Sequence, residues 1–228
     1  MSRFSVAVAA MLAGLVLACS HAGPASPERA VSAGPIGEPR PFAALYRLDC
    51  CRQSNLLATV RGDGESLSVA VAAGPAGTVV EAWLGVDGGW LRNGGERCVR
   101  MLPPGMLPLA GGAAVPLDPW LGALLLGGIV PLDARPSPRG AGWVEASAHG
   151  VTASWLVSGE IVTKVETARD GESGPALAVT LAEHHGHIPG RLVFRAGSES
   201  GELVLVEWRS AAAPLRPAWV TAPPCRER

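Results

Sequence analysis

The stretch DPWLGALLLGG, residues 118–128, decides the interpretation of the chain. Asp118 suits the N-cap of a helix, Pro119 suits its first position, and Gly127-Gly128 is a stop signal. No polar side chain separates these signals. The large apolar residues between them are Trp120, Leu121, Leu124, Leu125 and Leu126. A helix that is apolar all round is normally buried, so we predict a short lid helix within the concavity of a sheet.

The segments on both sides of this stretch alternate apolar and polar residues, which is typical of antiparallel strands. In SLSVAVA, residues 66–72, alternation places Leu67 and Val69 on one face. In VTASWLVSG, residues 151–159, the same alternation places Trp155 on the apolar face of the strand. About ten or eleven such segments are separated by turn residues. We predict a mainly β domain, a curved antiparallel sheet or half-open barrel, whose apolar face the helix covers.

A proline-broken apolar loop, MLPPGMLPLAGGAAVPL at residues 101–117, precedes the predicted helix. An apolar segment of this kind either packs under the sheet or stays exposed for a partner. The sequence leaves both alternatives open.

The N-terminus carries an apolar run from Val6 to Ala18 after a single charge, Arg3. This run is shorter than the about 20 residues that a spanning helix needs, and it fits a secretory signal peptide. Val16-Leu17-Ala18-Cys19 resembles the lipobox of bacterial lipoproteins. The resemblance implies cleavage before Cys19 and attachment of acyl chains to that cysteine. It implies a periplasm-facing anchor, and Ser20, in place of an aspartate, favours the outer membrane.

Composition divides the chain into four parts. We expect a signal peptide at 1–18, a Pro/Gly-rich tether at 19–41, a β domain at 42–210 and a C-terminal tail at 211–228. The formal net charge is −1, which offers no basic field for nucleic acid.

Four cysteines remain once Cys19 is lipidated, and an oxidising compartment favours their pairing. Cys50 and Cys51 are adjacent, so on a strand they point to opposite faces and seek different partners. We expect one of them to pair with Cys98 and the other to hold the tail through Cys225. The sequence contains no CxxC spacing of the kind that is typical of zinc sites, so the cysteines do not favour a metal site.

The order of elements resembles the LolA/LolB family of lipoprotein carriers and related outer-membrane lipoproteins. The likeness rests on DPWLGALLLGGIVPLD, on the strand at Gly142-Trp143, and on IPGRLVFRAGSESGELVLVEW. It implies a half-closed barrel with helices over an apolar cavity that receives acyl chains. The family's bulky apolar residue at an early hairpin tip is missing from Ala72–Thr78, where that loop is expected.

We therefore expect a non-enzymatic lipoprotein that binds acyl chains or a lipidated protein, without a cofactor. The candidate lipid-binding residues are Trp120, Leu121, Leu124, Leu125, Trp155, Leu67 and Val69, and Trp83 and Trp208 are further candidates for cavity lining. The alternative is an envelope scaffold with a filled core. No nucleophile elbow or phosphate loop supports an enzyme. His185 and His187 lie beside glycine and proline, where a solvated loop is expected rather than a zinc site.

Overall fold

A computed structural model of the chain describes residues 35–50, 53–74, 77–108, 114–169 and 174–225. The chain divides into two units, Met1–Val31 and Ser32–Arg228. The signal peptide, the lipobox and most of the tether lie outside the described residues, and every element below belongs to the second unit.

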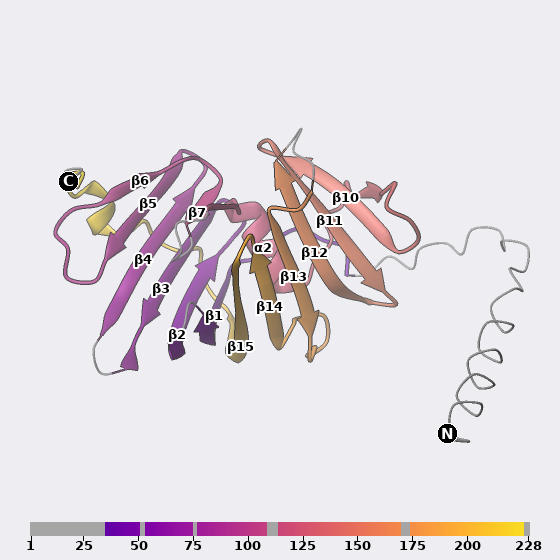
Figure 1. Ribbon diagram of the computed structural model, residues 1–228, viewed down its shortest axis with the longest axis horizontal. Helices are drawn as coiled ribbons and strands as arrows, with labels where there is room; N and C mark the ends of the chain where they lie inside the picture. The colour runs from indigo at the N-terminus through magenta and orange to yellow at the C-terminus, as the bar shows by residue number, and fades with distance from the viewer. Residues whose placement is uncertain (1–34, 51–52, 75–76, 109–113, 170–173, 226–228) are drawn as a thin grey trace, which may run out of the picture. The chain divides into compact units, whose positions relative to one another are not determined.

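One curved antiparallel sheet of 13 strands dominates the second unit (Figure 1). Its first meander consists of β1 (Phe42–Cys50), β2 (Gln53–Gly62), β3 (Ser66–Ala72), β4 (Thr78–Gly85), β5 (Gly88–Asn93) and β6 (Arg100–Leu102). Its second meander consists of β9 (Arg135–Pro136), β10 (Trp143–Ala148), β11 (Val151–Ser158), β12 (Ile161–Arg169), β13 (Leu177–Ala182), β14 (Arg191–Ala196) and β15 (Glu199–Ser210). Because β15 pairs with β1, the two meanders form one sheet, and β6 and β9 are its edges.

The predicted β fold, a curved and unclosed antiparallel sheet with a short helix, is confirmed. The sheet has more strands than the ten or eleven expected. The short edge strands, three residues in β6 and two in β9, are too brief to show alternation in the sequence.

The connection between the meanders contains the hairpin of β7 (Met106–Pro108) and β8 (Ala114–Pro116), followed by the helix α2 (Pro119–Gly127). Both predicted caps of α2 are present. The Leu121 backbone N–H donates to Oδ1 of Asp118 over 2.6 Å, and Gly128 adopts a left-handed φ of 61° at the C-cap. A Cβ at Gly128 would collide with the carbonyl oxygen of His187. Glycine is therefore favoured at this position both by the left-handed φ and by the lack of space for a side chain.

The helix packs directly onto β3. A Cβ added at Gly122 would lie only 2.9 Å from Cδ2 of Leu67, so the missing side chain permits the close approach of helix and sheet. Leu124 is 0% exposed. The predicted burial of the helix against the sheet is confirmed.

The apolar connection at 101–117 combines both alternatives left open by its sequence. Met106 and Val115 are buried in the β7–β8 hairpin, whereas Met101 on β6 is 75% exposed. Leu109 lies outside the described residues. The hairpin thus contributes to the core, and the edge strand before it presents an apolar side chain to solvent.

Candidate functional site

The inner face of the sheet is apolar across both meanders. Strand register aligns one row of side chains from β4 to β15 and a second row from β10 to β14. The first row is Ala82, Val69, Val60, Ala44 and Trp208, and the second is Val144, Trp155, Val165, Val179 and Phe194. Cross-strand neighbours of this kind form one continuous apolar surface.

Most of the predicted lipid-binding residues lie within the protein's own core. Leu67, Leu121, Leu124, Leu125 and Trp155 are all buried, and they belong to a single cluster. Val69 and Trp120 are partly exposed at the margin of that cluster. The structure therefore brings the seven predicted residues together, with side chains of the protein filling the space between α2 and β3.

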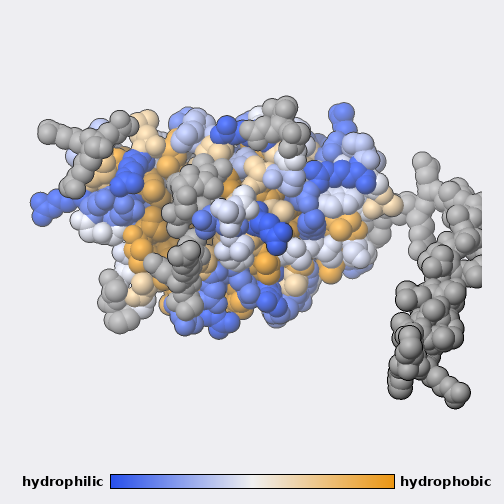
Figure 2. Space-filling view, in the orientation of Figure 1, coloured by the Kyte–Doolittle hydropathy of each residue, from blue (hydrophilic) through white to orange (hydrophobic). Residues whose placement is uncertain are grey.

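A part of the inner face on β1, β3 and β15 remains partly exposed. We call it the open strip, and it consists of Leu48, Val69, Val71, Leu203 and Leu205. Figure 2 shows hydrophobic residues gathered in a band over β3 and β4. Each of these five side chains packs against the core cluster and keeps part of its surface exposed.

Two donors on the inner face have no hydrogen-bond partner among the described residues. They are the hydroxyl of Tyr46 and the Nε1 of Trp155, and both side chains are 0% exposed. Burial raises the pKa of the Tyr46 phenol, so Tyr46 stays a neutral donor. A buried donor without a partner is costly, and each of these could be satisfied by a carbonyl oxygen or a water.

The C-terminal tail packs on the opposite, outer face of the first meander. The guanidinium of Arg216 lies 4.6 Å from the ring centroid of Trp90, and that of Arg92 lies 5.2 Å from the ring centroid of Trp219. The tail continues to the sheet edge, where the Cys225 N–H donates to the carbonyl of Val99 over 2.9 Å. Its 3-10 turn η2 (Ala218–Thr221) buries Val220.

The expected cysteine pairing is wrong, because Cys98 is bonded to Cys225 with a Cα–Cα distance of 4.8 Å. Cys50 ends β1, whereas Cys98 precedes β6 at the sheet edge. Strands β1 and β6 are five positions apart, about 24 Å at the usual strand spacing, and a disulfide spans less than about 7 Å. Cys51 lies outside the described residues.

Trp83, predicted as cavity lining, lies on the outer face instead. It pairs with Trp90 on β5 and Ser68 on β3, opposite the inward-facing Leu84. Alternation along TVVEAWLG already groups Trp83 with Glu81, which could have placed it correctly. Trp208 does reach the inner side, where its ring stacks on Phe42 with centroids 4.5 Å apart.

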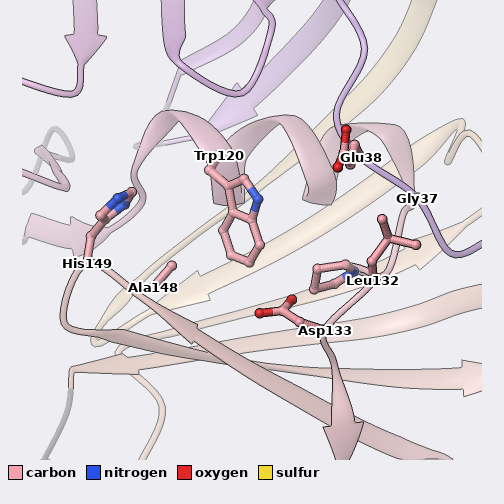
Figure 3. Close-up of a pocket in the computed structure, with 8 residues that line it drawn as sticks. Gly37, Glu38, Trp120, Leu132, Asp133, Ala148 and His149 are labelled. Carbon is pink, nitrogen blue, oxygen red and sulfur yellow. The ribbon is translucent and has the colours of Figure 1, made fainter.

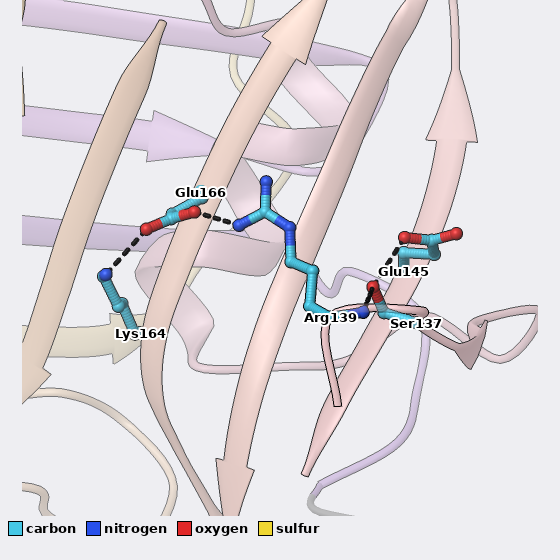
Figure 4. A network of polar contacts seen from close by, with 5 residues as sticks. All are labelled: Ser137, Arg139, Glu145, Lys164 and Glu166. Carbon is cyan, nitrogen blue, oxygen red and sulfur yellow. Dashed lines mark hydrogen bonds and ion pairs between the residues drawn. The ribbon is translucent and has the colours of Figure 1, made fainter. Parts of the chain in front are cut away.

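The outer face of the second meander carries a polar network (Figure 4). Glu166 forms ion pairs with Arg139 and with Lys164, whose Nζ lies 2.6 Å from Oε1. Both cations also lie over the ring of Trp143. Burial acts to raise the pKa of Glu166, but the hydrogen bonds and charges of the two cations outweigh it and lower that pKa.

The loop at residues 184–187, which carries three histidines, makes hydrogen bonds to the backbone of the fold. His184 Nε2 lies 2.9 Å from the carbonyl of Val162, and His185 pairs with Ile188 through backbone hydrogen bonds. Within the described part of the chain, the one group with metal-ligand proximity is Glu96, Cys98 and Cys225. The disulfide occupies both sulfur atoms of that group.

A pocket of about 470 Å³ opens beside the N-terminal end of α2 (Figure 3). It is lined by Gly37, Glu38, Trp120, Pro131, Leu132, Asp133, Ala148 and His149. Of these, only Trp120 was singled out from the sequence. The others come from three further segments with no shared motif, so no local signal could have assembled them.

The described residues contain no helix long and apolar enough to cross a membrane.

Comparisons with known proteins give distant structural likenesses. No family model matches the sequence, and no curated protein sequence matches it. A LolA superfamily protein from Nitrosomonas europaea is similar over 77% of this chain and 88% of its own, with a TM-score of 0.46 and 11% identity. The lipoprotein LppX from Mycobacterium tuberculosis is similar over 76% of this chain and 88% of its own, with a TM-score of 0.31 and 13% identity. A beta-barrel-like protein of a domain family of unknown function from Brucella abortus is similar over 75% of this chain and 98% of its own, with a TM-score of 0.30 and 11% identity.

Proposed function

We propose that the protein binds an acyl chain, free or attached to a protein, along the open strip of the inner face. The observation that carries this proposal is the mismatch between the apolar face and its cover. The cover of the 13-stranded sheet consists of the nine-residue helix α2 and the β7–β8 hairpin, and the side chains of the open strip stay partly exposed. Apolar surface that the protein leaves open in this way is a candidate ligand site.

The chemistry of the strip fits a lipid tail. Its five side chains are leucines and valines from three strands, so contact is non-directional and tolerates chains of different structure. Each methylene transferred from water onto such a surface contributes about 0.8 kcal/mol. The hydroxyl of Tyr46, which has no hydrogen-bond partner within the described part of the chain, could donate to a ligand carbonyl.

The proposal includes the anchor predicted from the N-terminus. With Cys19 acylated, the chain is held at the outer membrane facing the periplasm, and the tether allows the domain to reach lipid or lipoprotein cargo. Mass spectrometry of the membrane-extracted protein tests this part. A peptide that begins at an acylated Cys19 supports it, and an unmodified thiol at that position contradicts it.

The binding experiment uses the mature chain, residues 19–228, with Cys19→Ala to prevent lipidation. A fluorescent fatty acid is titrated against this protein and against Val69→Glu, which places a charge in the open strip. Ser68→Glu is the matched control, because Ser68 adjoins Val69 on the same strand but faces outward. We expect binding to be lost in the first variant and kept in the second. Equal binding by both variants would contradict the site.

A second function, an envelope scaffold with a filled core, is favoured by the burial of α2. Leu121 and Leu124 are at most 1% exposed, so the central space is already occupied by side chains. In this case the exposed Met101 on the edge strand contacts another protein. Crosslinking should then recover one fixed partner that Met101→Glu loses, while no fatty acid binds to the parent protein at any concentration tested.

A further inference from the structure

The pocket beside α2 is built from four segments that are tied to one another. Gly37 donates its N–H to the carbonyl of Val130 over 3.0 Å, and Val130 donates to Pro35 over 3.0 Å. His149, at the turn between β10 and β11, lies with Nδ1 2.6 Å from Oδ2 of Asp118. These contacts fix the pocket walls against α2, so the concavity is an ordered feature of the fold.

Trp120 provides the aromatic wall of the pocket. Its ring packs edge-on against Trp155, with centroids 6.5 Å apart and planes at 89°. Pro131, Leu132 and Ala148 supply apolar surface around it. Figure 3 shows the indole reaching from α2 toward Leu132 and Asp133. A tryptophan ring at a pocket wall can hold a ligand cation over its electron-rich face.

The charge that lines the pocket is acidic and uncompensated. Glu38 and Asp133 both contribute carboxylates, and neither has a hydrogen bond or ion pair with another described residue. No lysine or arginine is among the lining residues. In Figure 3 Glu38 lies to the upper right of the indole and Asp133 lies below it. A ligand at this position meets two negative charges beside an aromatic ring.

The N-terminus of α2 and the His149 ring, which lie beside the pocket, are groups that can attract an anion. Asp118 contacts both of them. The N-terminus of α2 is capped by Asp118, whose Oδ1 accepts the Leu121 N–H, so the helix end carries its own negative charge. The ring of His149 is paired with the other oxygen of the same carboxylate. The field in the pocket is therefore that of Glu38 and Asp133.

We propose that this pocket binds an alkylammonium group. A cation over a tryptophan face gains about 0.5–2 kcal/mol, and quaternary ammonium ligands are bound in this manner. The two carboxylates supply Coulombic attraction, and the apolar wall accepts the alkyl substituents. The volume of about 470 Å³ is sufficient for a small ligand. The group could belong to a lipid headgroup or to a free amine. The site shares no residue with the open strip, so it stands independently of acyl-chain binding.

The test is calorimetric titration of the mature Cys19→Ala chain, residues 19–228, with choline and with its neutral isostere 3,3-dimethylbutan-1-ol. We expect choline to bind at least about tenfold more tightly than the isostere, because only choline carries the charge. The exposed double variant Glu38→Gln/Asp133→Asn should lose that preference. Glu65→Gln is the matched control, since Glu65 is an exposed acid that lines a different pocket. Equal affinity for the two compounds, no detectable choline binding, or an unchanged double variant would each overturn the proposal.

Vesicle flotation separates the two sources of the cation. If the ligand is a headgroup, phosphatidylcholine vesicles carry the protein and phosphatidylglycerol vesicles do not, and the double variant remains unbound. If the ligand is a free amine, choline binds in the calorimeter and neither vesicle does. Displacement of choline by millimolar calcium would assign the carboxylates to a divalent cation and overturn the proposal.

Discussion

The two meanders of the sheet have the same alternation but different covers. In the second meander, Trp155 and Val165 are 0% exposed on the inner face, although Leu203 and Leu205 on β15 belong to the open strip. The outer face of this meander meets solvent through an ion-pair network. In the first meander, Val69 and Val71 stay partly exposed inside, while the tail packs on the outer face around Trp90. Alternation therefore selects which side chains face inward, but the segments outside the sheet decide how far each face is closed.

The largest expected effect concerns the tail that covers the first meander. Replacing both cysteines, Cys98→Ser/Cys225→Ser, releases a cross-link between residues 127 positions apart. The chain-entropy account puts the loss for a loop of this length at about 5 kcal/mol. We expect a lower urea midpoint, and limited proteolysis should cut within the tail, residues 211–228, before it cuts the sheet. A Cys50→Ser variant is the control, because Cys50 lies outside this bond. Comparable stability of the double variant and the parent would contradict a structural role for the tail.

The next largest effect compares one substitution in the two meanders. Val165→Ala removes two methyl groups from a site that is 0% exposed, and we expect a loss of about 2–3 kcal/mol. Val69→Ala makes the same change on the open strip, where the side chain is already partly hydrated. We expect a loss of about 1 kcal/mol or less there.

Urea unfolding of both valine variants measures the difference. Equal losses would mean that the inner face is as closed at Val69 as at Val165, and that the open strip is filled in solution. Added fatty acid should raise the urea midpoint of the parent protein and have less effect on Val69→Ala, because a ligand that binds only the folded state stabilises it.

The faces of strands and the ends of α2 could be predicted because they depend on local order. Alternation placed Leu67 and Val69 inward, and the Asp118 cap and Gly128 stop set the helix boundaries. These signals lie within a few residues of the features they determine. The cysteine pairing could not be found in this way, because it depends on strand order across the whole sheet.

The pocket beside α2 was missed for a related reason. Glu38 and Asp133 are 95 positions apart in the chain (133 − 38). Nothing in the sequence around either residue distinguishes it from an ordinary surface acid. They meet at one pocket because the segment at Gly37 pairs with Val130 in parallel. A single parallel bridge between irregular segments leaves no periodic pattern to recognise.

A smaller effect is expected at Glu166, on the outer face of the second meander. Its pKa is lowered in the folded state, so its charge contributes stability above the ordinary carboxyl range, and this contribution is lost as pH falls through the folded pKa. We expect Glu166→Gln to cost about 1–2 kcal/mol at neutral pH and less near about pH 3. Thermal unfolding at both pH values measures this, with the exposed Glu207→Gln as control. A cost that persists unchanged in acid would assign the effect to packing.

The smallest expected effect has the opposite sign and concerns Tyr46, on β1 where the two meanders join. Its hydroxyl is buried with no hydrogen-bond partner in the segments that the structure describes. Tyr46→Phe therefore removes a desolvated polar group and should stabilise the protein by up to about 1 kcal/mol. The measurement is urea unfolding of the delipidated protein, repeated with bound fatty acid. If the hydroxyl donates to a ligand carbonyl, the variant gains stability alone but binds the fatty acid more weakly than the parent. A loss of stability without ligand would instead mean that an ordered water satisfies the hydroxyl, and the boundary between the meanders would then be closed to a ligand head group.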